Sequence, residues 1–450
     1  MKINFNNTRT AISKHMLADG MSPVIDLERS HGSWLVDGNT GKEYLDLFSM
    51  YASMSIGYNH PYVMENIDRL TKAAINKPAN SDIYSPEMAE FVETVGRIAQ
   101  PSYMPYAFFI EGGGLAVENA LKTAFDWKAK KNAVLGKKVP ENLVLHLKDC
   151  FHGRTGYTMS LTDSPDPRKV MHFPKFNWPR VTNPSIKFPL DNDNLEEVIK
   201  LEKQSINETK DFLSKHPDDV ACMILEPIQG EGGDNHFRPE YFKQLKTLSL
   251  ENDFLLIYDE VQTGIGITGK MWAHQHFCEP NCEINCKLHC ESMEPDVISF
   301  GKKTQCCGIF AGNRLNEIEN HVFKESSRIN STFGGNLVDM VRFTIYLELM
   351  EKDDLVNMAS ENGEYLLSCL SSLKNHNDDI ITNVRGKGLF CAFDLPTPDH
   401  RDKLISNMEA EGAIILGCGH NSIRFRPHLN VLKEEIDQAM SMMQIALSKL

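Results

Sequence analysis

Residues 254–259 read FLLIYD and residues 297–302 read VISFGK, so two apolar runs stop abruptly at polar or glycine residues. The same pattern recurs at residues 107–110 (AFFI), 143–147 (LVLHL) and 220–225 (VACMIL). Short apolar runs without polar alternation are typical of strands that are buried on both faces, as in a parallel sheet. We therefore predict a mostly parallel sheet in which these five runs are strands.

Helical segments are expected between the predicted strands. Residues 116–130 (AVENALKTAFDWKAK), for example, carry an apolar stripe with helical spacing. Alternating strands and helices predict an α/β fold, whose ligands bind at the carboxyl ends of the strands. The two chain ends instead carry Gly/Asn turn signals and shorter elements. We predict a large domain over residues 76–340 and a small α+β domain built from residues 1–75 and 341–450.

The composition restricts the class of protein. The chain has 450 residues, 41% of them apolar, and its 47 basic and 61 acidic residues give a net charge of −14. This excludes a disordered chain, a coiled coil and a disulfide-stapled miniprotein. The acidic balance argues against nucleic acid and membrane surfaces as partners, since both select for clustered Lys and Arg. Because the N-terminal segment lacks an apolar signal region and the 11 cysteines are odd in number, we expect a cytoplasmic protein.

Two charged residues follow predicted strands directly. Lys302 comes after a buried run and a glycine, and a partly desolvated lysine there can have a lowered pKa and attack a carbonyl group. Lys303 is its neighbour, so the choice of nucleophile stays open. Asp259 ends the run FLLIYD, where a carboxylate needs a cationic or hydrogen-bonding partner. A protonated pyridine nitrogen would suit it, and capping of the following turn is the alternative.

A glycine cluster and an aromatic–basic segment complete the candidate site. Gly112–Gly114 lies between a predicted strand and a helix, where backbone N–H groups can bind a phosphate. Phe151 offers a face for stacking on a planar ring, and Arg154 offers a guanidinium for a carboxylate. Each feature alone also fits a turn, a core residue or a surface charge. Together with the lysine and the aspartate they are the requirements of pyridoxal 5'-phosphate.

The sequence resembles the class III aminotransferases, which have the fold type I of pyridoxal-phosphate-dependent transferases. The stretch LLIYDEVQTGIG, followed by PDVISFGKK, matches the family signature, and the resemblance continues through GYNHP, EGGGLAVENALK, EPIQGEGGD, STFGGN and IRFRPHL. The segments FHGRTGYTMSLTDS and FGKKTQCCG are most similar to the L-lysine 6-transaminases. The resemblance implies transfer of the ε-amino group of L-lysine to 2-oxoglutarate, giving 2-aminoadipate 6-semialdehyde and L-glutamate. Another ω-aminotransferase, acting on ornithine or 4-aminobutyrate, is the alternative.

The resemblance also implies roles toward the cofactor. Lys302 matches the lysine that forms the Schiff base and then moves a proton at the substrate carbon. Asp259 matches the partner of the pyridine nitrogen, and Gln262 the residue that hydrogen-bonds the phenolic oxygen of the ring. Phe151 matches the aromatic residue that stacks on the ring.

The phosphate of the cofactor is implied to contact two segments. Gly113 and Gly114 match the turn that surrounds it. Thr332, in STFGGN, matches a threonine that reaches the phosphate from a second subunit. The resemblance therefore implies a homodimer whose active site lies at the subunit interface.

The resemblance implies two sites for substrate carboxylates. Arg154 matches the arginine that holds the carboxylate distal to the reacting end, and Arg424 the one that holds the α-carboxylate of glutamate. Glu231 matches a residue that pairs with this second arginine while the bound substrate lacks a carboxylate at its reacting carbon. A permanent structural ion pair between Glu231 and Arg424 is the alternative. Asn330 is implied as a further substrate contact.

An apparent insertion carries four evenly spaced cysteines, Cys278, Cys282, Cys286 and Cys290. Four thiols can bind zinc, but structural zinc sites usually pair their ligands across a tight turn. Zinc binding, disulfides and an ordinary exposed loop remain open, and transamination needs no metal. A metal-binding regulatory protein built on these cysteines would leave the lysine and aspartate pattern unexplained. A nucleotide-binding dehydrogenase is disfavoured because GxGxxG is missing.

Overall fold

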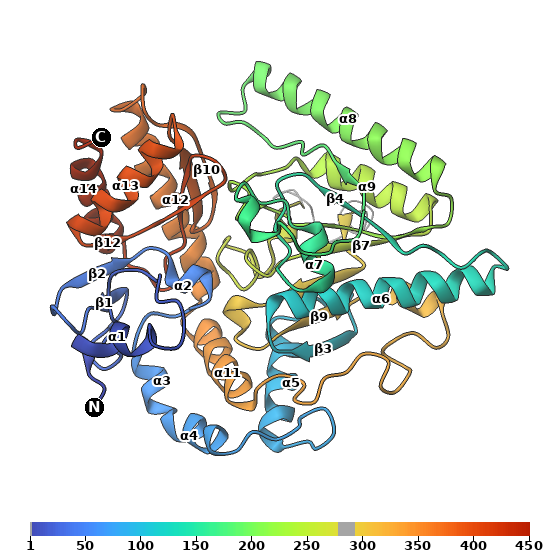
Figure 1. Ribbon diagram of the computed structural model, residues 1–450, viewed down its shortest axis with the longest axis horizontal. Coiled ribbons are helices and arrows are strands. Elements are labelled where there is room, and N and C mark those ends of the chain that lie inside the picture. Colours follow the sequence, from blue (N-terminus) through green and yellow to red (C-terminus); the bar gives the residue numbers. More distant parts are fainter. Residues whose placement is uncertain (1, 278–292) are drawn as a thin grey trace.

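The computed structural model describes residues 2–277 and 293–450, so the four evenly spaced cysteines lie outside the described residues. Figure 1 shows two lobes: a large one around the central sheet, and a small one formed by segments from both ends of the chain. None of the helices in these two ranges is long and apolar enough to cross a membrane.

The large lobe is built on a seven-stranded sheet with the order β3-β9-β8-β7-β6-β4-β5. Neighbouring strands pair in parallel, except that β9 is antiparallel to both β3 and β8. All five predicted runs are strands of this sheet, which confirms the expected α/β class. The bounds are β3 (Tyr106–Ile110), β4 (Leu143–Leu147), β5 (Arg180–Val181), β6 (Val220–Leu225), β7 (Leu255–Asp259), β8 (Val297–Phe300) and β9 (Cys307–Ala311).

Both faces of this sheet are apolar because helices cover both. On one face Leu256 packs with side chains of α8 (Asn192–Lys215) and α9 (Pro239–Glu251). On the other face Ile257 packs with side chains of α6 (Gly113–Val134). Successive residues of β7 therefore point to opposite buried faces. This is why the run lacks polar alternation.

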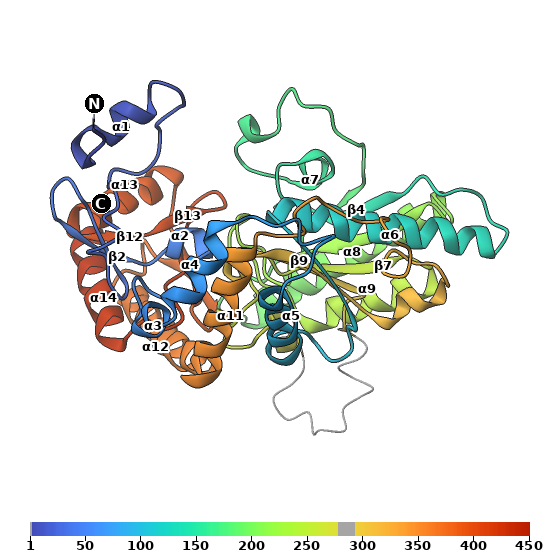
Figure 2. The same cartoon turned by 90° about the horizontal axis from the view of Figure 1, so that it is seen from below.

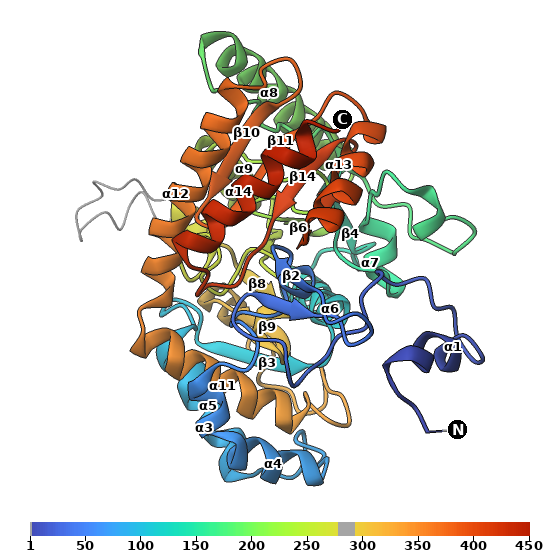
Figure 3. The ribbon, with the colours of Figure 1, turned by 90° about the vertical axis from the view of Figure 1, so that its left-hand side faces the viewer.

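The small lobe contains two sheets. An antiparallel sheet with the order β10-β11-β14-β13 lies beside α12, α13 and α14 (Figure 3). A second sheet, β1-β2-β12, joins the two chain ends, because β2 pairs in parallel with β12. The domain division at residues 75 and 340 stays a prediction. The bounds are β1 (Trp34–Val36), β2 (Glu43–Asp46), β10 (Thr382–Lys387), β11 (Phe390–Asp394), β12 (Ala413–Ile414), β13 (Leu416–Cys418), β14 (Ser422–Phe425), α12 (Leu355–Asn375), α13 (Pro398–Glu411) and α14 (Lys433–Leu447).

The remaining helices connect the lobes or project from them. The long helix α11 packs against α5 and α4. Figures 2 and 3 show the N-terminal segment with α1 and the segment with α7 projecting on the same side of the molecule. The bounds are α1 (Thr8–Ile12), α3 (Pro61–Glu65), α4 (Ile67–Ile75), α5 (Pro86–Ile98), α7 (Gly156–Leu161) and α11 (Leu337–Lys352), with short 3-10 turns at η1 (Phe5–Asn7), η2 (Pro167–Lys169), η3 (Ala273–Phe277), η5 (Lys302–Thr304) and η6 (Asn313–Glu317).

Candidate active site

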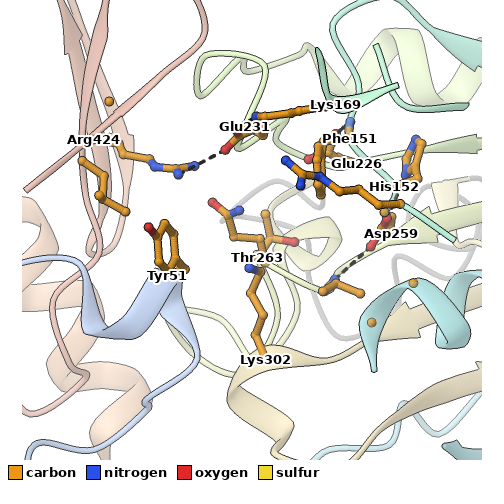
Figure 4. Close-up of a pocket in the computed structure, with 18 residues that line it drawn as sticks. Tyr51, Phe151, His152, Lys169, Glu226, Glu231, Asp259, Thr263, Lys302 and Arg424 are labelled. Carbon is orange, nitrogen blue, oxygen red and sulfur yellow. Dashed lines mark hydrogen bonds and ion pairs between the residues drawn. The ribbon is translucent and has the colours of Figure 1, made fainter. Parts of the chain in front are cut away.

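A pocket of about 660 Å³ lies at the carboxyl ends of the parallel strands, beside the start of α6 and against the small lobe (Figure 4). In α/β folds, ligands bind at the carboxyl ends of the strands, so a ligand is expected in this pocket. Nine of the eleven predicted site residues line it. These are Gly113, Gly114, Phe151, Arg154, Glu231, Asp259, Gln262, Lys302 and Arg424.

Lys302 enters the pocket from the end of β8. Its backbone has a φ of 53°, in the left-handed region that non-glycine residues rarely adopt. Such strained conformations concentrate at functional sites. Burial, with a further contribution from the charge of Arg424, lowers the pKa of Lys302 to about 8. A substantial fraction of this amine is therefore neutral, and nucleophilic, slightly above neutral pH.

Lys303 points elsewhere and is only 1% exposed. Its Nζ donates hydrogen bonds to the carbonyl oxygens of Gln262, at 2.6 Å, and Ala52, at 3.3 Å. Burial lowers the pKa of Lys303 well below its ordinary value. Of the two adjacent lysines, Lys302 lines the pocket and Lys303 ties two backbone segments together.

One of those segments, α2 (Ser49–Ala52), is a single left-handed turn that brings Tyr51 to the pocket. All four of its residues have positive φ, from 40° at Ser49 to 62° at Ala52. Left-handed conformation costs roughly 1–2 kcal/mol per residue. The hydrogen bond from Lys303 to Ala52 helps to hold this turn. Tyr51 is not among the predicted site residues, because no residue type marks a left-handed turn without glycine.

Asp259 is the last residue of β7 and is 5% exposed. Its Oδ2 lies 2.7 Å from Nδ1 of His152, and its Oδ1 accepts a hydrogen bond of 3.1 Å from the Val261 N–H. Burial lowers the pKa of His152. The neighbouring Cys150 sulfur and the hydrogen bond to Asp259 raise it by more than burial lowers it, so the pKa of His152 lies well above its ordinary value. The carboxylate thus has a fixed orientation in a buried environment. His152 is not among the predicted site residues, although it directly follows Phe151.

Glu226 directly follows β6, the strand beside β7, and it was also missed. Its Oε1 accepts a hydrogen bond of 2.9 Å from the Phe151 N–H, and its Oε2 one of 3.0 Å from the Gly230 N–H. Burial raises the pKa of Glu226 to about 7. The side chain therefore joins the loop that carries the stacking candidate Phe151 to the turn that precedes Glu231.

The glycine cluster begins α6. Gly112 precedes the helix with a φ of 95°, and the N–H groups of the first helical turn have no partner within the helix. A Cβ atom on Gly113 would lie 3.0 Å from Cγ1 of Val261, and one on Gly114 would lie 3.3 Å from Thr155. Glycine at both positions lets these side chains pack closely against the helix start, whose free N–H groups can bind an anion.

The pocket contains one paired arginine and one open arginine. Arg424, on β14, is 6% exposed at its side chain, and its NH2 atom lies 3.1 Å from Oε2 of Glu231. The second oxygen of Glu231 lies 2.8 Å from Nζ of Lys169, which the sequence analysis did not identify. Burial raises the pKa of Glu231, but the charges of Arg424 and Lys169 lower it below its ordinary value. Arg154 is exposed and makes no hydrogen bond or ion pair with the residues that the structure describes.

Gln262 also lines the pocket. Its side-chain oxygen accepts hydrogen bonds from Nε of Arg426, at 3.2 Å, and from its NH2 atom, at 3.1 Å. Arg426 also pairs with the buried Asp234. The amide nitrogen of Gln262 is therefore the group that remains for a ligand.

Asn330 and Thr332 do not line the pocket of their own chain. Both are exposed, with the carbonyl oxygen of Thr332 accepting a hydrogen bond of 3.0 Å from Ser81. The side-chain oxygen of Asn330 accepts one of 2.8 Å from the Ser331 N–H. Their predicted contacts to cofactor and substrate stay predictions.

This mostly parallel sheet, with a lysine, a buried carboxylate and a helix start around one pocket, is the arrangement of an aminotransferase. The sequence profile of class-III aminotransferases matches residues 16–447. The chain belongs to the class-III aminotransferase family, as the sequence motifs predicted.

Two relatives illustrate the range of this family. The L-lysine-epsilon aminotransferase of Amycolatopsis lactamdurans is 43% identical over 98% of this chain and 96% of its own. The 4-aminobutyrate aminotransferase of Schizosaccharomyces pombe is 33% identical over 95% and 91%. Among solved structures, a lysine aminotransferase from M. tuberculosis covers 99% of this chain and 100% of its own, with a TM-score of 0.94 and 44% identity.

Proposed function

We propose that the protein transfers the ε-amino group of L-lysine to 2-oxoglutarate, giving 2-aminoadipate 6-semialdehyde and L-glutamate. The ion pair between Glu231 and Arg424, in the same pocket as Lys302 and the open Arg154, carries this proposal. Relatives named L-lysine-epsilon aminotransferase support the choice of lysine over ornithine or 4-aminobutyrate.

The residues of the pocket fit pyridoxal 5'-phosphate. Asp259 offers a buried carboxylate to a protonated ring nitrogen, and the start of α6 at Gly113 and Gly114 offers N–H groups to a phosphate. Phe151 offers a ring face, and Gln262 an amide nitrogen for the phenolic oxygen. When bound, pyridoxal phosphate supplies an electron sink that makes the carbon bearing the amino group acidic.

Lys302 is proposed to move the proton at the reacting carbon. Its lowered pKa leaves a neutral amine that would take a proton from the ε-carbon of lysine and pass it to the bound cofactor in the first half-reaction. In the second half-reaction it would carry a proton from the cofactor to the α-carbon of the new glutamate. The partly enclosed pocket limits exchange of that proton with water. His152 would hold Asp259 ionised and oriented toward the ring nitrogen.

The two arginines explain why both substrates can react in one pocket. L-Lysine reacts at a carbon without a carboxylate, so its α-carboxylate would bind at the distal Arg154 while Glu231 compensates Arg424. 2-Oxoglutarate carries a carboxylate at each end, so one would bind Arg154 and the other would replace Glu231 on Arg424. A buried guanidinium then has a counterion in both half-reactions.

A homodimer with shared active sites is part of the proposal. Thr332 and Asn330 are exposed in the single chain. Thr332 lies in the motif STFGGN, which the family places against a neighbouring subunit's cofactor, and Asn330 directly precedes this motif. Thr332 would contact the phosphate bound by the partner subunit, and Asn330 would contact the substrate. The active site would then require two chains.

Isotope transfer tests the regiochemistry of the proposal. The purified holoenzyme is incubated with 2-oxoglutarate and L-lysine that carries ¹⁵N at either the ε or the α position, and the glutamate is analysed by mass spectrometry. Label in glutamate from the ε position alone is expected. Label from the α position would contradict the proposed orientation of lysine.

A further inference from the structure

Glu231 has two cationic partners from different parts of the fold. Its Oε2 lies 3.1 Å from Arg424 on β14 of the small lobe. Its Oε1 lies 2.8 Å from Lys169 at the end of η2, in the large lobe. Figure 4 shows the carboxylate between the two cations. Nothing in the proposed half-reactions uses Lys169.

We propose that Lys169 is a positioning residue that holds Glu231 while Arg424 binds the carboxylate of a dicarboxylate substrate. The inference rests on the proposed function, in which Glu231 leaves Arg424 during one half-reaction. Lys169 contacts the oxygen that does not face Arg424. The carboxylate can therefore turn away from the guanidinium without losing its remaining partner.

Burial makes this second partner important. The side chains of Arg424, Glu231 and Lys169 are 6%, 28% and 20% exposed. A carboxylate that leaves its only counterion in such surroundings is poorly compensated. Because Lys169 keeps the displaced Glu231 paired, the carboxylate of a ligand can take its place on Arg424 without leaving a buried carboxylate uncompensated.

Lys169 is held in place by a second contact. Its Nζ lies 5.9 Å from the ring centroid of Phe151, within the range of cation–π attraction. Its neighbour Arg168 offers a matched control, because that side chain is 84% exposed and pairs with Asp166. Removing the charge of Arg168 alters the same turn without altering the partners of Glu231.

Binding of non-reacting acids to the holoenzyme tests the inference. Glutarate carries two carboxylates with the spacing of 2-oxoglutarate, and pentanoate carries one. By calorimetry, Lys169→Met is expected to weaken glutarate binding by about threefold to tenfold and to leave pentanoate binding unchanged. Lys169→Arg should retain the affinity for glutarate, and Arg168→Met should behave as the unaltered protein.

A double-mutant cycle separates positioning from direct contact. In a Glu231→Gln background, Lys169→Met should have no further effect on glutarate affinity, because the group that it positions is gone. An equal loss in that background would show that Lys169 contacts the ligand directly, which overturns the inference. Unchanged or tighter glutarate binding by Lys169→Met alone would overturn it as well.

The experiments distinguish failure of the proposed function from failure of the role proposed for Lys169. If L-lysine and 2-oxoglutarate do not react while glutarate affinity still depends on Lys169 through Glu231, the substrate assignment is wrong and the role of Lys169 stands. If both substrates react and glutarate affinity ignores Lys169, the inference alone is wrong.

Discussion

Nδ1 of His152 lies 2.7 Å from Oδ2 of Asp259, and both side chains are buried at the far end of the pocket from Arg424 (Figure 4). The imidazole gives the terminal carboxylate of β7 the partner that a buried charge requires. The stability of the fold and the chemistry of the pocket therefore depend on the same hydrogen bond.

Replacing His152 by Leu is expected to destabilise the apoprotein by about 1–3 kcal/mol, because a buried carboxylate oxygen loses its donor. Chemical unfolding of the apoprotein measures this change without any contribution from a cofactor. His376→Leu, at an exposed position, should change the free energy of unfolding by less than about 0.5 kcal/mol. Equal stability of the two variants would contradict the role given to the His152–Asp259 hydrogen bond.

The lowered pKa of Lys302 predicts a pH dependence of cofactor uptake. Only the neutral amine attacks an aldehyde, so the rate of pyridoxal phosphate uptake by the apoprotein should rise with pH and level off above about 8. Stopped-flow absorbance measures the profile. Lys302→Ala should lose this phase, and its aminotransferase activity should fall by about 10²- to 10⁴-fold.

Arg424→Met should move the inflection of that profile to higher pH. The charge of Arg424 is, after burial, the largest contribution that lowers the pKa of Lys302. Without the arginine, the negative charge of Glu231 remains, and this charge raises the pKa of Lys302. An unchanged inflection would show that burial alone sets the pKa.

Glu231→Gln is expected to weaken the preference for the ε-nitrogen of lysine. Without the carboxylate, Arg424 can accept the α-carboxylate of lysine, which places the α-amino group at the reacting position. The isotope experiment described above should then show transfer of α-¹⁵N into glutamate. Asp402→Asn, at a side chain that is 63% exposed, serves as the control and should transfer only the ε label.

Mixing two inactive variants tests the shared active site. Thr332→Ala and Lys302→Ala chains should each be strongly impaired, but a mixed dimer has one site with both residues intact. After subunit exchange at equal amounts, about a quarter of the sites should be active. Mass spectrometry shows whether mixed dimers have formed. If they have formed and no activity returns, either Thr332 and Lys302 act in the site of the same chain, or Thr332 takes no part in the site.

Much of the fold could be predicted because burial on both faces leaves a clear sequence pattern. The strands that end at Ile110, Leu147, Leu225, Asp259 and Phe300 all come from runs without polar alternation. The reversal of β9 could not be predicted. It depends on the turn at η5, whose residues KKT carry no glycine or proline signal.

Site residues were predicted where several features and the family motifs combine into one pattern, and they were missed where the only signal is a contact between distant residues. Glu226 ends an apolar run as Asp259 does, but its role depends on hydrogen bonds to two separate loops. Lys169 lies 62 residues from Glu231 in the sequence, and nothing near it indicates their contact. Tyr51 reaches the pocket only through a left-handed turn that its sequence does not favour.

The most direct test of the central claim is the spectrum of the holoenzyme in single half-reactions. L-Lysine, L-ornithine or 4-aminobutyrate is added without a keto acid, and the visible absorption band of the bound cofactor is followed. We expect lysine to remove the band most rapidly and 2-oxoglutarate to restore it. A band that lysine leaves unchanged, while ornithine or 4-aminobutyrate removes it, would contradict the lysine assignment.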